Sequence, residues 1–192
     1  MSQFEFFFSL YGLVLGLSVV ELVSGVARLA HSRARVRIGV LVPMLACLML
    51  LDLASFWMNA FRSLQDYPLT YATMVIALAI SGLYYVAASV VFPSDFAAEP
   101  DLDQVYMRHR RLVIGIMVGA GVIAFEVLPM LTAEGRAERL AYWGDPTRVW
   151  QPLAFFAAAG GIIATKRKGI NIACLALLIL PYVYMFTVSL PR

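Results

Sequence analysis

Residues 6–30 read FFFSLYGLVLGLSVVELVSGVARLA, and the only charged residues within this stretch are Glu21 and Arg28. A helix needs about 20 consecutive, mostly apolar residues to cross the hydrocarbon core of a bilayer. This stretch is long enough, and the residues before it lack the basic segment that opens a cleavable signal peptide. We therefore expect it to be retained as a first transmembrane helix.

Five further apolar stretches follow, so the sequence predicts six transmembrane helices. The expected spans are residues 4–30, 36–61, 68–92, 112–131, 149–165 and 170–190. Of the 192 residues, 61% are hydrophobic and 14% are charged, whereas a soluble domain carries about 25% charged residues. A core of this size cannot hide so many apolar side chains from water. The chain is therefore predicted to be an all-α integral membrane protein, with residues 1–192 forming a single six-helix bundle.

The distribution of basic residues predicts the orientation of this bundle. Alternate loops place ten Lys and Arg residues on one side: Arg28, Arg33, Arg35, Arg37, Arg108, Arg110, Arg111, Lys166, Arg167 and Lys168. The other side receives five: Arg62, Arg136, Arg139, Arg148 and Arg192. Because the richer side is expected in the cytoplasm, both termini are predicted to lie outside (N-out/C-out), in a multi-pass protein of the inner membrane.

Aromatic residues agree with this orientation. They gather towards the expected outer ends of the spans, where amphipathic rings collect at a membrane interface. The set comprises Phe6, Phe7, Phe8, Tyr11, Tyr67, Tyr71, Tyr142, Trp143, Trp150, Tyr182 and Tyr184.

The basic loops are expected to contact the anionic headgroups of membrane lipids. The residues of this set are Arg33, Arg35, Arg37, Arg108, Arg110, Arg111, Lys166, Arg167 and Lys168. Residues 93–111 also hold four acids, but they lack the glycine and terminal Glu of an EF-hand. We therefore favour a solvated loop over a divalent-ion site.

The loop after the fourth span has a different pattern. Residues 132–139 begin with Thr132, a residue type that caps helices, and carry charges of both signs. A short interfacial helix is therefore expected on the outer side.

Polar residues at helical spacing follow one face of each of the first two spans: Glu21, Ser24 and Arg28 in the first, and Asp52, Ser55 and Asn59 in the second. Exposing an aspartate to hydrocarbon at the centre of a helix costs at least about 2.5 kcal/mol. These faces are therefore expected to turn inward, with the two spans packed as an antiparallel hairpin. We expect Arg28 or a tyrosine hydroxyl beside Glu21, and a polar cavity beside Asp52.

Two residues of later spans are candidates for the same cavity. Tyr84 and Tyr85 point about 100° apart on a helix, so at most one of them is expected to face it. For Glu126, which is followed by Pro129 near the end of its span, a structural contact is favoured over a functional one. By helical rise, Asp52 and Glu126 lie about 22 Å from the inner boundary and Glu21 about 10 Å from it. A polar path across the membrane would have acids at such different depths, and so would three unrelated structural contacts.

Small residues indicate where helices approach each other closely. GxxxG patterns occur at Gly12 and Gly16, and again at Gly115 and Gly119. Such patterns favour tight helix packing, and they indicate a homo-oligomer only weakly.

Several chemistries are not expected from this sequence. Cys47 and Cys174 lie in apolar spans without metal-binding spacing. His31 and His109 lie at the cytoplasmic edge, where they cannot form a haem pair inside the bundle. We expect no metal, no cofactor and no catalytic residues. Nucleic acid is not expected as a partner, because the positive charge lies in loops beside the spans.

Three hypotheses about function follow. The first is a small transporter or channel that moves a small solute or an ion with proton involvement, lined by Glu21, Ser24, Arg28, Asp52, Ser55, Asn59, Tyr84 and Glu126. The second is a scaffold or sensor that transports nothing and binds lipid or a partner membrane protein. A membrane-embedded lipid-modifying enzyme is the least favoured. Carboxylates each held by a neighbouring helix, without a cavity, would weaken the transport hypothesis.

Overall fold

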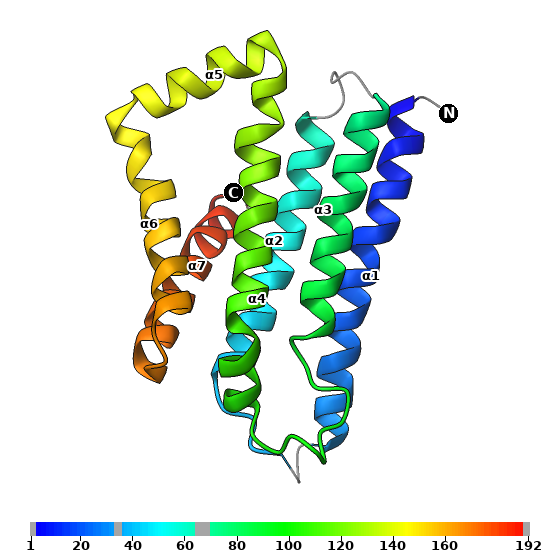
Figure 1. The fold of residues 1–192 in the computed structure, drawn as a ribbon, viewed down its shortest axis with the longest axis vertical. Coiled ribbons are helices and arrows are strands. Elements are labelled where there is room, and N and C mark those ends of the chain that lie inside the picture. Colours follow the sequence, from blue (N-terminus) through cyan, green and yellow to red (C-terminus); the bar gives the residue numbers. More distant parts are fainter. Residues whose placement is uncertain (1–2, 33–35, 64–69, 190–192) are drawn as a thin grey trace.

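The structure of the chain is a computed structural model, which describes residues 3–32, 36–63 and 70–189. Over these residues the protein is all-helical, with seven α-helices (Figure 1). The helices are α1 (Gln3–Ser32), α2 (Leu41–Ser63), α3 (Tyr71–Ser89), α4 (Leu102–Val122), α5 (Ala133–Gly144), α6 (Pro146–Ala164) and α7 (Lys168–Ser189). A π-helical turn, Ile123–Val127, and a 3₁₀ turn, Pro129–Leu131, follow α4.

Among the described residues, four helices are long and apolar enough to cross a membrane: Phe4–Ser32, Leu41–Arg62, Tyr71–Ser89 and Lys168–Ser189. These stretches belong to α1, α2, α3 and α7. By contrast, α4 carries three arginines within its first half, and the first turn of α6 includes Thr147 and Arg148. Length and composition therefore make this a candidate membrane protein with four candidate spanning helices.

The first two helices pack against each other, as expected of a hairpin. The most extensive contact of α1, however, is with α3. Helices α3 and α2 both contact α4, while α7 packs against α2 and α6 against α4 (Figure 1). Gly12 lies close to α2, because a Cβ at this position would lie 3.0 Å from the Trp57 ring. At Gly16, Gly115 and Gly119 a Cβ would meet nothing within 4 Å, so these glycines do not mark close approaches within the chain.

Two expectations about the loops have different outcomes. The short helix expected after the fourth span is confirmed as α5, and the Thr132 hydroxyl accepts a hydrogen bond from Gly135 N at 3.1 Å. The expected loop over residues 93–111 is wrong in its second half, because α4 begins at Leu102 with Asp101 as its N-cap. The basic residues Arg108, Arg110 and Arg111 lie within this helix, whereas Asp95 and Glu99 precede it. Arg33, Arg35 and the expected start of the third span at Pro68 lie outside the described residues.

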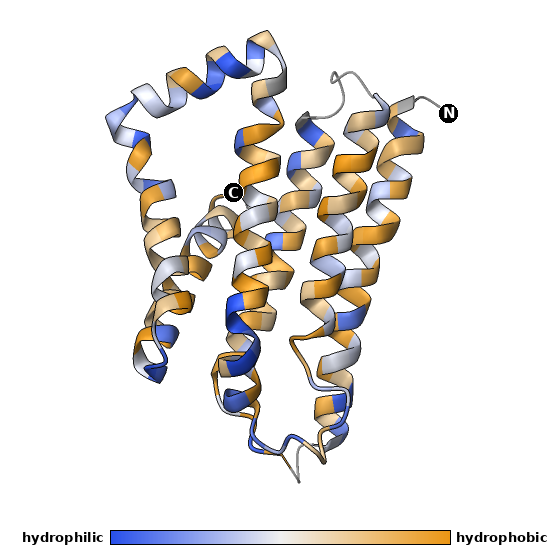
Figure 2. Ribbon diagram, viewed as in Figure 1, coloured by the Kyte–Doolittle hydropathy of each residue, from blue (hydrophilic) through white to orange (hydrophobic). Residues whose placement is uncertain are grey.

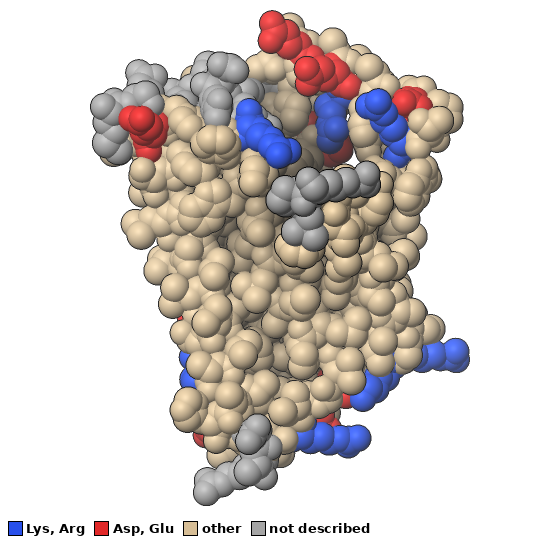
Figure 3. Space-filling view, turned by 180° about the vertical axis from the view of Figure 1, so that it is seen from behind, with Lys and Arg blue, Asp and Glu red and all other residues tan. Residues whose placement is uncertain are grey.

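Polar residues concentrate at the two ends of the molecule. Figure 2 shows hydrophilic residues along α5 and at the start of α4, with hydrophobic residues along most of α1 and α3. On the face drawn in Figure 3, Lys, Arg, Asp and Glu gather at both ends, and other residues form the broad surface between them. The described residues thus form a bundle with an apolar middle and two charged ends.

Candidate functional site

Asp52 of α2 is the most enclosed of the three acids that the sequence places within spans. Its exposed fraction is 8%, and hydroxyls from two other helices donate hydrogen bonds to its carboxylate. Tyr84 of α3 donates to Oδ2 at 2.5 Å, and Tyr182 of α7 donates to Oδ1 at 2.7 Å. A buried carboxylate needs such donors, because water is not there to solvate it. The cluster therefore joins α2, α3 and α7 at one point in the interior.

Packing around this cluster fixes the tyrosine on α3. The Tyr84 ring lies 4.9 Å from the Phe56 ring, between centroids, and Phe56 lies 5.1 Å from Phe125 in an edge-to-face arrangement. Asp52 and Phe56 are four residues apart and so share one face of α2. Tyr84 is fully buried while Tyr85 is 41% exposed, which confirms that only one of the adjacent tyrosines faces inward.

Glu21 lies in a looser environment on α1. Arg28, two turns along the same helix, donates to its carboxylate at 3.4 Å. The side chains are 28% exposed for Glu21 and 42% for Arg28. The expectation that Arg28 partners Glu21 is thus confirmed, although the contact is long and stays within one helix.

The remaining residues of the expected polar stripes do not form a common interior face. Ser24, Ser55 and Asn59 are half-buried. The Asp52 carboxylate accepts hydrogen bonds from side chains of α3 and α7, and Glu21 binds Arg28 on its own helix. The structure therefore does not bring Glu21 and Asp52 together in one cluster.

Glu126 lies in the π-helical turn after α4 and binds two side chains of α5. Arg139 donates to Oε1 at 2.7 Å, and the Trp143 indole donates to Oε2 at 2.9 Å. Pro129 has no N–H, so the Phe125 carbonyl loses the donor that an α-helix would give it. Arg139 Nε replaces that donor at 2.6 Å. This acid thus serves to fix α5 across the end of α4, in line with the structural contact favoured from the sequence.

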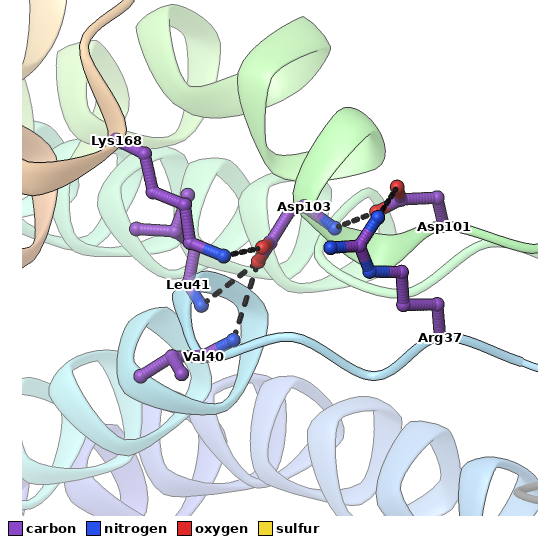
Figure 4. A network of polar contacts seen from close by, with 6 residues as sticks. All are labelled: Arg37, Val40, Leu41, Asp101, Asp103 and Lys168. Atoms are coloured by element: carbon purple, nitrogen blue, oxygen red, sulfur yellow. Dashed lines mark hydrogen bonds and ion pairs between the residues drawn. The ribbon is translucent and has the colours of Figure 1, made fainter.

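A second polar network lies at the opposite, basic end of the bundle (Figure 4). Asp103, in the first turn of α4, accepts hydrogen bonds from Val40 N and Leu41 N, each at 3.2 Å. It also accepts a bond from the ammonium group of Lys168, the first residue of α7. A carboxylate at the N-terminus of a helix is favourable, because the first N–H groups there have no partner within the helix. One side chain of α4 therefore caps α2 and anchors the start of α7.

The segment before α2 is shaped to admit this carboxylate. Gly39 has φ +63°, and a Cβ at this position would overlap the Asp103 carboxylate. Only glycine adopts this backbone conformation readily and also leaves the necessary space. Nearby, Arg37 lies 3.7 Å from the Asp101 carboxylate, and Asp101 caps α4 by accepting from Asp103 N at 3.0 Å.

We expect the Asp103 network to weaken in acid. Burial alone raises the pKa of the Asp103 carboxyl, but the Lys168 ammonium and the Leu41 and Val40 N–H groups outweigh it and hold the pKa below its usual value. Stability from this group is therefore present above the unfolded-state pKa of about 3.9 and is lost as pH falls through the lower folded-state pKa. Asp103→Asn should lower the free energy of unfolding by about 1–2 kcal/mol at pH 7.

The measurement is denaturant unfolding in mixed micelles at pH 7 and pH 3, with Glu138→Gln on α5 as the exposed control. The variant should also show less acid destabilisation than the wild type. Equal losses in Asp103→Asn and Glu138→Gln would contradict this role.

Two arginines of α4 bind the end of α6. Arg110 Nε donates to Ile162 O and Arg111 Nε to Ile163 O, both at 3.0 Å. Cations are favourable there, because the last carbonyls of a helix have no intrahelical donor. Arg110 is only 2% exposed, so it differs from the expectation that it meets lipid headgroups. Arg111 is exposed.

Two cavities lie apart from the three acids. One, of about 600 Å³, lies between α1 and α2 and is lined by Phe8, Leu15, Val19, Leu50, Leu53, Ala54, Trp57, Met58 and Phe61. The other, of about 480 Å³, lies at the basic end and is lined by Ala27, Arg28, His31, Ser32, Val36, Ser94, Asp95, Phe96 and Ala97. Neither wall includes Glu21, Asp52 or Glu126, so the polar cavity expected beside Asp52 is not one of these two.

Sequence patterns missed several residues that the structure brings into these clusters. Tyr11 and Tyr182 were placed in the outer aromatic belt, yet Tyr11 is 5% exposed and Tyr182 binds Asp52. The partnership of Asp103 with Lys168 joins residues 65 positions apart. The one usable local signal was the pair of acids at 101 and 103, which suits a helix start.

No group of three or more His, Cys, Asp or Glu side chains within the described ranges could hold a metal ion. No family model, no curated protein and no solved structure matches this chain.

Proposed function

We propose that the chain is a multi-pass protein of the inner membrane that binds lipid or a partner membrane protein and transports nothing. In this proposal α1, α2, α3, α4, α6 and α7 are the six spans, and both termini lie outside. The charged ends on either side of an apolar middle support this arrangement (Figure 3). The excess of Lys and Arg at the Asp103 end supports a cytoplasmic position for that end.

The observation that carries the binding function is the way the three acids are held. Tyr84 and Tyr182 bind Asp52, Arg139 and Trp143 bind Glu126, and Arg28 binds Glu21. A side chain that moves protons or ions along a path must release one partner and bind another. These three carboxylates are instead bound by side chains of the same helix or of neighbouring helices. Such contacts are what interhelical packing in a membrane uses.

The cavity between α1 and α2 supports the same proposal. Its wall consists mainly of apolar side chains from the two helices, including Leu15 and Leu53, and the Trp57 indole adds one N–H group. A wall of this kind suits an acyl chain or an apolar helix better than a polar solute or an ion.

We expect the purified protein to retain a stoichiometric lipid or protein partner. The measurement is native mass spectrometry after extraction in a mild detergent, with cross-linking in membranes as a second readout. A bound mass that survives repeated detergent exchange supports the proposal. A bare monomer under all conditions, with no cross-linked partner, would contradict it.

A second candidate function, proton-coupled movement of a small solute or ion, has one specific observation in its favour. Asp52 accepts hydrogen bonds from two tyrosine hydroxyls, and Tyr11 is close enough to interact electrostatically with its carboxylate. If this cluster moves protons, Asp52→Asn should abolish pH-dependent flux in proteoliposomes while leaving the protein folded. Flux that is unchanged across pH would remove Asp52 from any transport mechanism.

A further inference from the structure

The cavity of about 480 Å³ at the basic end has a mixed lining. One wall is the C-terminal end of α1, which contributes Arg28, His31 and Ser32. The facing wall is the loop after α3, which contributes Ser94 and Asp95. Apolar side chains complete it, so the cavity combines charged groups of both signs with an apolar surface.

Close packing of α1 against the end of α3 builds this cavity. A Cβ at Gly25 would overlap the Phe92 ring, so only glycine lets the chain after α3 lie directly against α1. Phe92 and Pro93 are buried by this approach, and the next residues fold over the last turns of α1. The loop is thereby held opposite Arg28 at the level where the apolar part of α1 ends.

The charged groups of the two walls are not paired with each other. Arg28 binds Glu21 at 3.4 Å, on its own helix, and it forms no ion pair with Asp95. Asp95 Oδ1 accepts a hydrogen bond from Ala97 N at 2.8 Å, within its own loop. His31 Nδ1 donates to Ala27 O at 2.7 Å, which fixes the ring at the cavity wall. A cation and an anion thus face one space without neutralising each other.

We propose that this cavity binds the headgroup of a zwitterionic amino phospholipid. The phosphate lies against Arg28 and His31, and the primary ammonium lies against Asp95. Arginine is well suited to phosphate, because its guanidinium offers several N–H donors in a planar array. A simple anion in this cavity would be repelled by the negative charge of Asp95. A free phosphate would also leave the apolar side chains of Val36 and Phe96 without an apolar group to contact.

This inference rests on the proposed binding function and names the ligand for one site. The test uses full-length protein in detergent supplied with equal amounts of phosphatidylethanolamine, phosphatidylcholine and phosphatidylglycerol, with bound lipid counted by native mass spectrometry. The wild type should retain phosphatidylethanolamine in preference to both others. Losing a charge-assisted bond typically weakens binding by about tenfold, so Arg28→Gln should reduce retention of phosphatidylethanolamine to that extent.

A second variant tests the ammonium end of the site. Asp95→Asn should still retain phospholipid but should lose the preference for phosphatidylethanolamine over phosphatidylcholine, whose quaternary ammonium has no N–H to donate. Arg62→Gln, at the far end of α2, is the matched control and should bind as the wild type does.

The possible outcomes separate the inference from the proposed function. Lipid retained equally by the wild type, Arg28→Gln and Asp95→Asn would overturn the headgroup site while leaving a lipid-binding function intact. If Arg62→Gln lost as much bound lipid as Arg28→Gln, binding would depend on general surface charge, and the headgroup site would be overturned. Displacement of the lipid by millimolar inorganic phosphate would make it a site for a free anion instead. Absence of any retained lipid or partner in the wild type would reject the proposed function itself.

Discussion

Asp52→Ala should lower the free energy of unfolding by about 2–4 kcal/mol, which is among the largest effects we expect of any single substitution. The Tyr84 and Tyr182 hydroxyls would both lose their acceptor, and the shortened side chain would leave a cavity between α2 and its neighbours. An unsatisfied buried donor costs about 1–3 kcal/mol. Hydrogen bonds between membrane helices contribute about 0.6–2 kcal/mol each, so the total stays within this range. Asp52→Asn keeps the side-chain volume and one oxygen that can accept a hydrogen bond. This variant should therefore lose less stability than Asp52→Ala.

The tyrosines provide matched controls for this prediction. Tyr84→Phe removes a buried hydroxyl bound to Asp52, whereas Tyr85→Phe removes a hydroxyl from its 41% exposed neighbour on α3. Unfolding should be measured in mixed micelles for Asp52→Ala, Tyr84→Phe, Tyr182→Phe and the double variants. Both tyrosines bind the same carboxylate. A double variant that combines Tyr84→Phe or Tyr182→Phe with Asp52→Ala should therefore lose clearly less stability than the sum of the two single losses. Equal effects of Tyr84→Phe and Tyr85→Phe, or strict additivity, would contradict the cluster.

Arg139→Ala should lower the free energy of unfolding by about 2–3 kcal/mol. This side chain binds the Glu126 carboxylate at 2.7 Å and the Phe125 carbonyl at 2.6 Å, and only 19% of it is exposed. Breaking a buried ion pair from one side costs about 3–5 kcal/mol, and the partial exposure of this pair reduces that figure. The loss should appear as detachment of α5 from the end of α4.

The control for Arg139→Ala lies on the same helix. Arg136 has the same charge and is exposed, so Arg136→Ala should change stability by less than about 0.5 kcal/mol. Limited proteolysis between α5 and α6 should increase in Arg139→Ala alone. Equal stability and equal cleavage in the two variants would show that the Glu126 contact does not hold α5.

Local sequence patterns were sufficient for the helices and for some of their ends. The apolar stretches gave α1, α2, α3 and α7, because length and hydropathy are properties of contiguous residues. The cap at Thr132 is equally local, since its partner Gly135 is three residues away. The start of α4 was missed because charged residues can continue a helix beyond its apolar part.

Contacts between distant segments could not be predicted from these patterns. Tyr182 and Asp52 are 130 residues apart, and nothing in the neighbourhood of either residue distinguishes an inward tyrosine from one at the membrane interface. The expected packing of α1 against α2 relied on the short connection between them, and the two helices do touch. Close packing at Gly25 and Phe92 also brings α1 against the end of α3, and this contact is the more extensive one.

We propose that Asp52 and Glu126 hold neighbouring helices together, and that no acid within the spans carries protons across the membrane. The most direct test is proton flux into sealed proteoliposomes that enclose a pH-sensitive dye, measured after an imposed pH gradient. We predict that wild-type vesicles leak no faster than protein-free vesicles, and that Asp52→Asn changes only the stability of the protein. Wild-type flux well above that of empty vesicles, and lost in a folded Asp52→Asn variant, would contradict the claim.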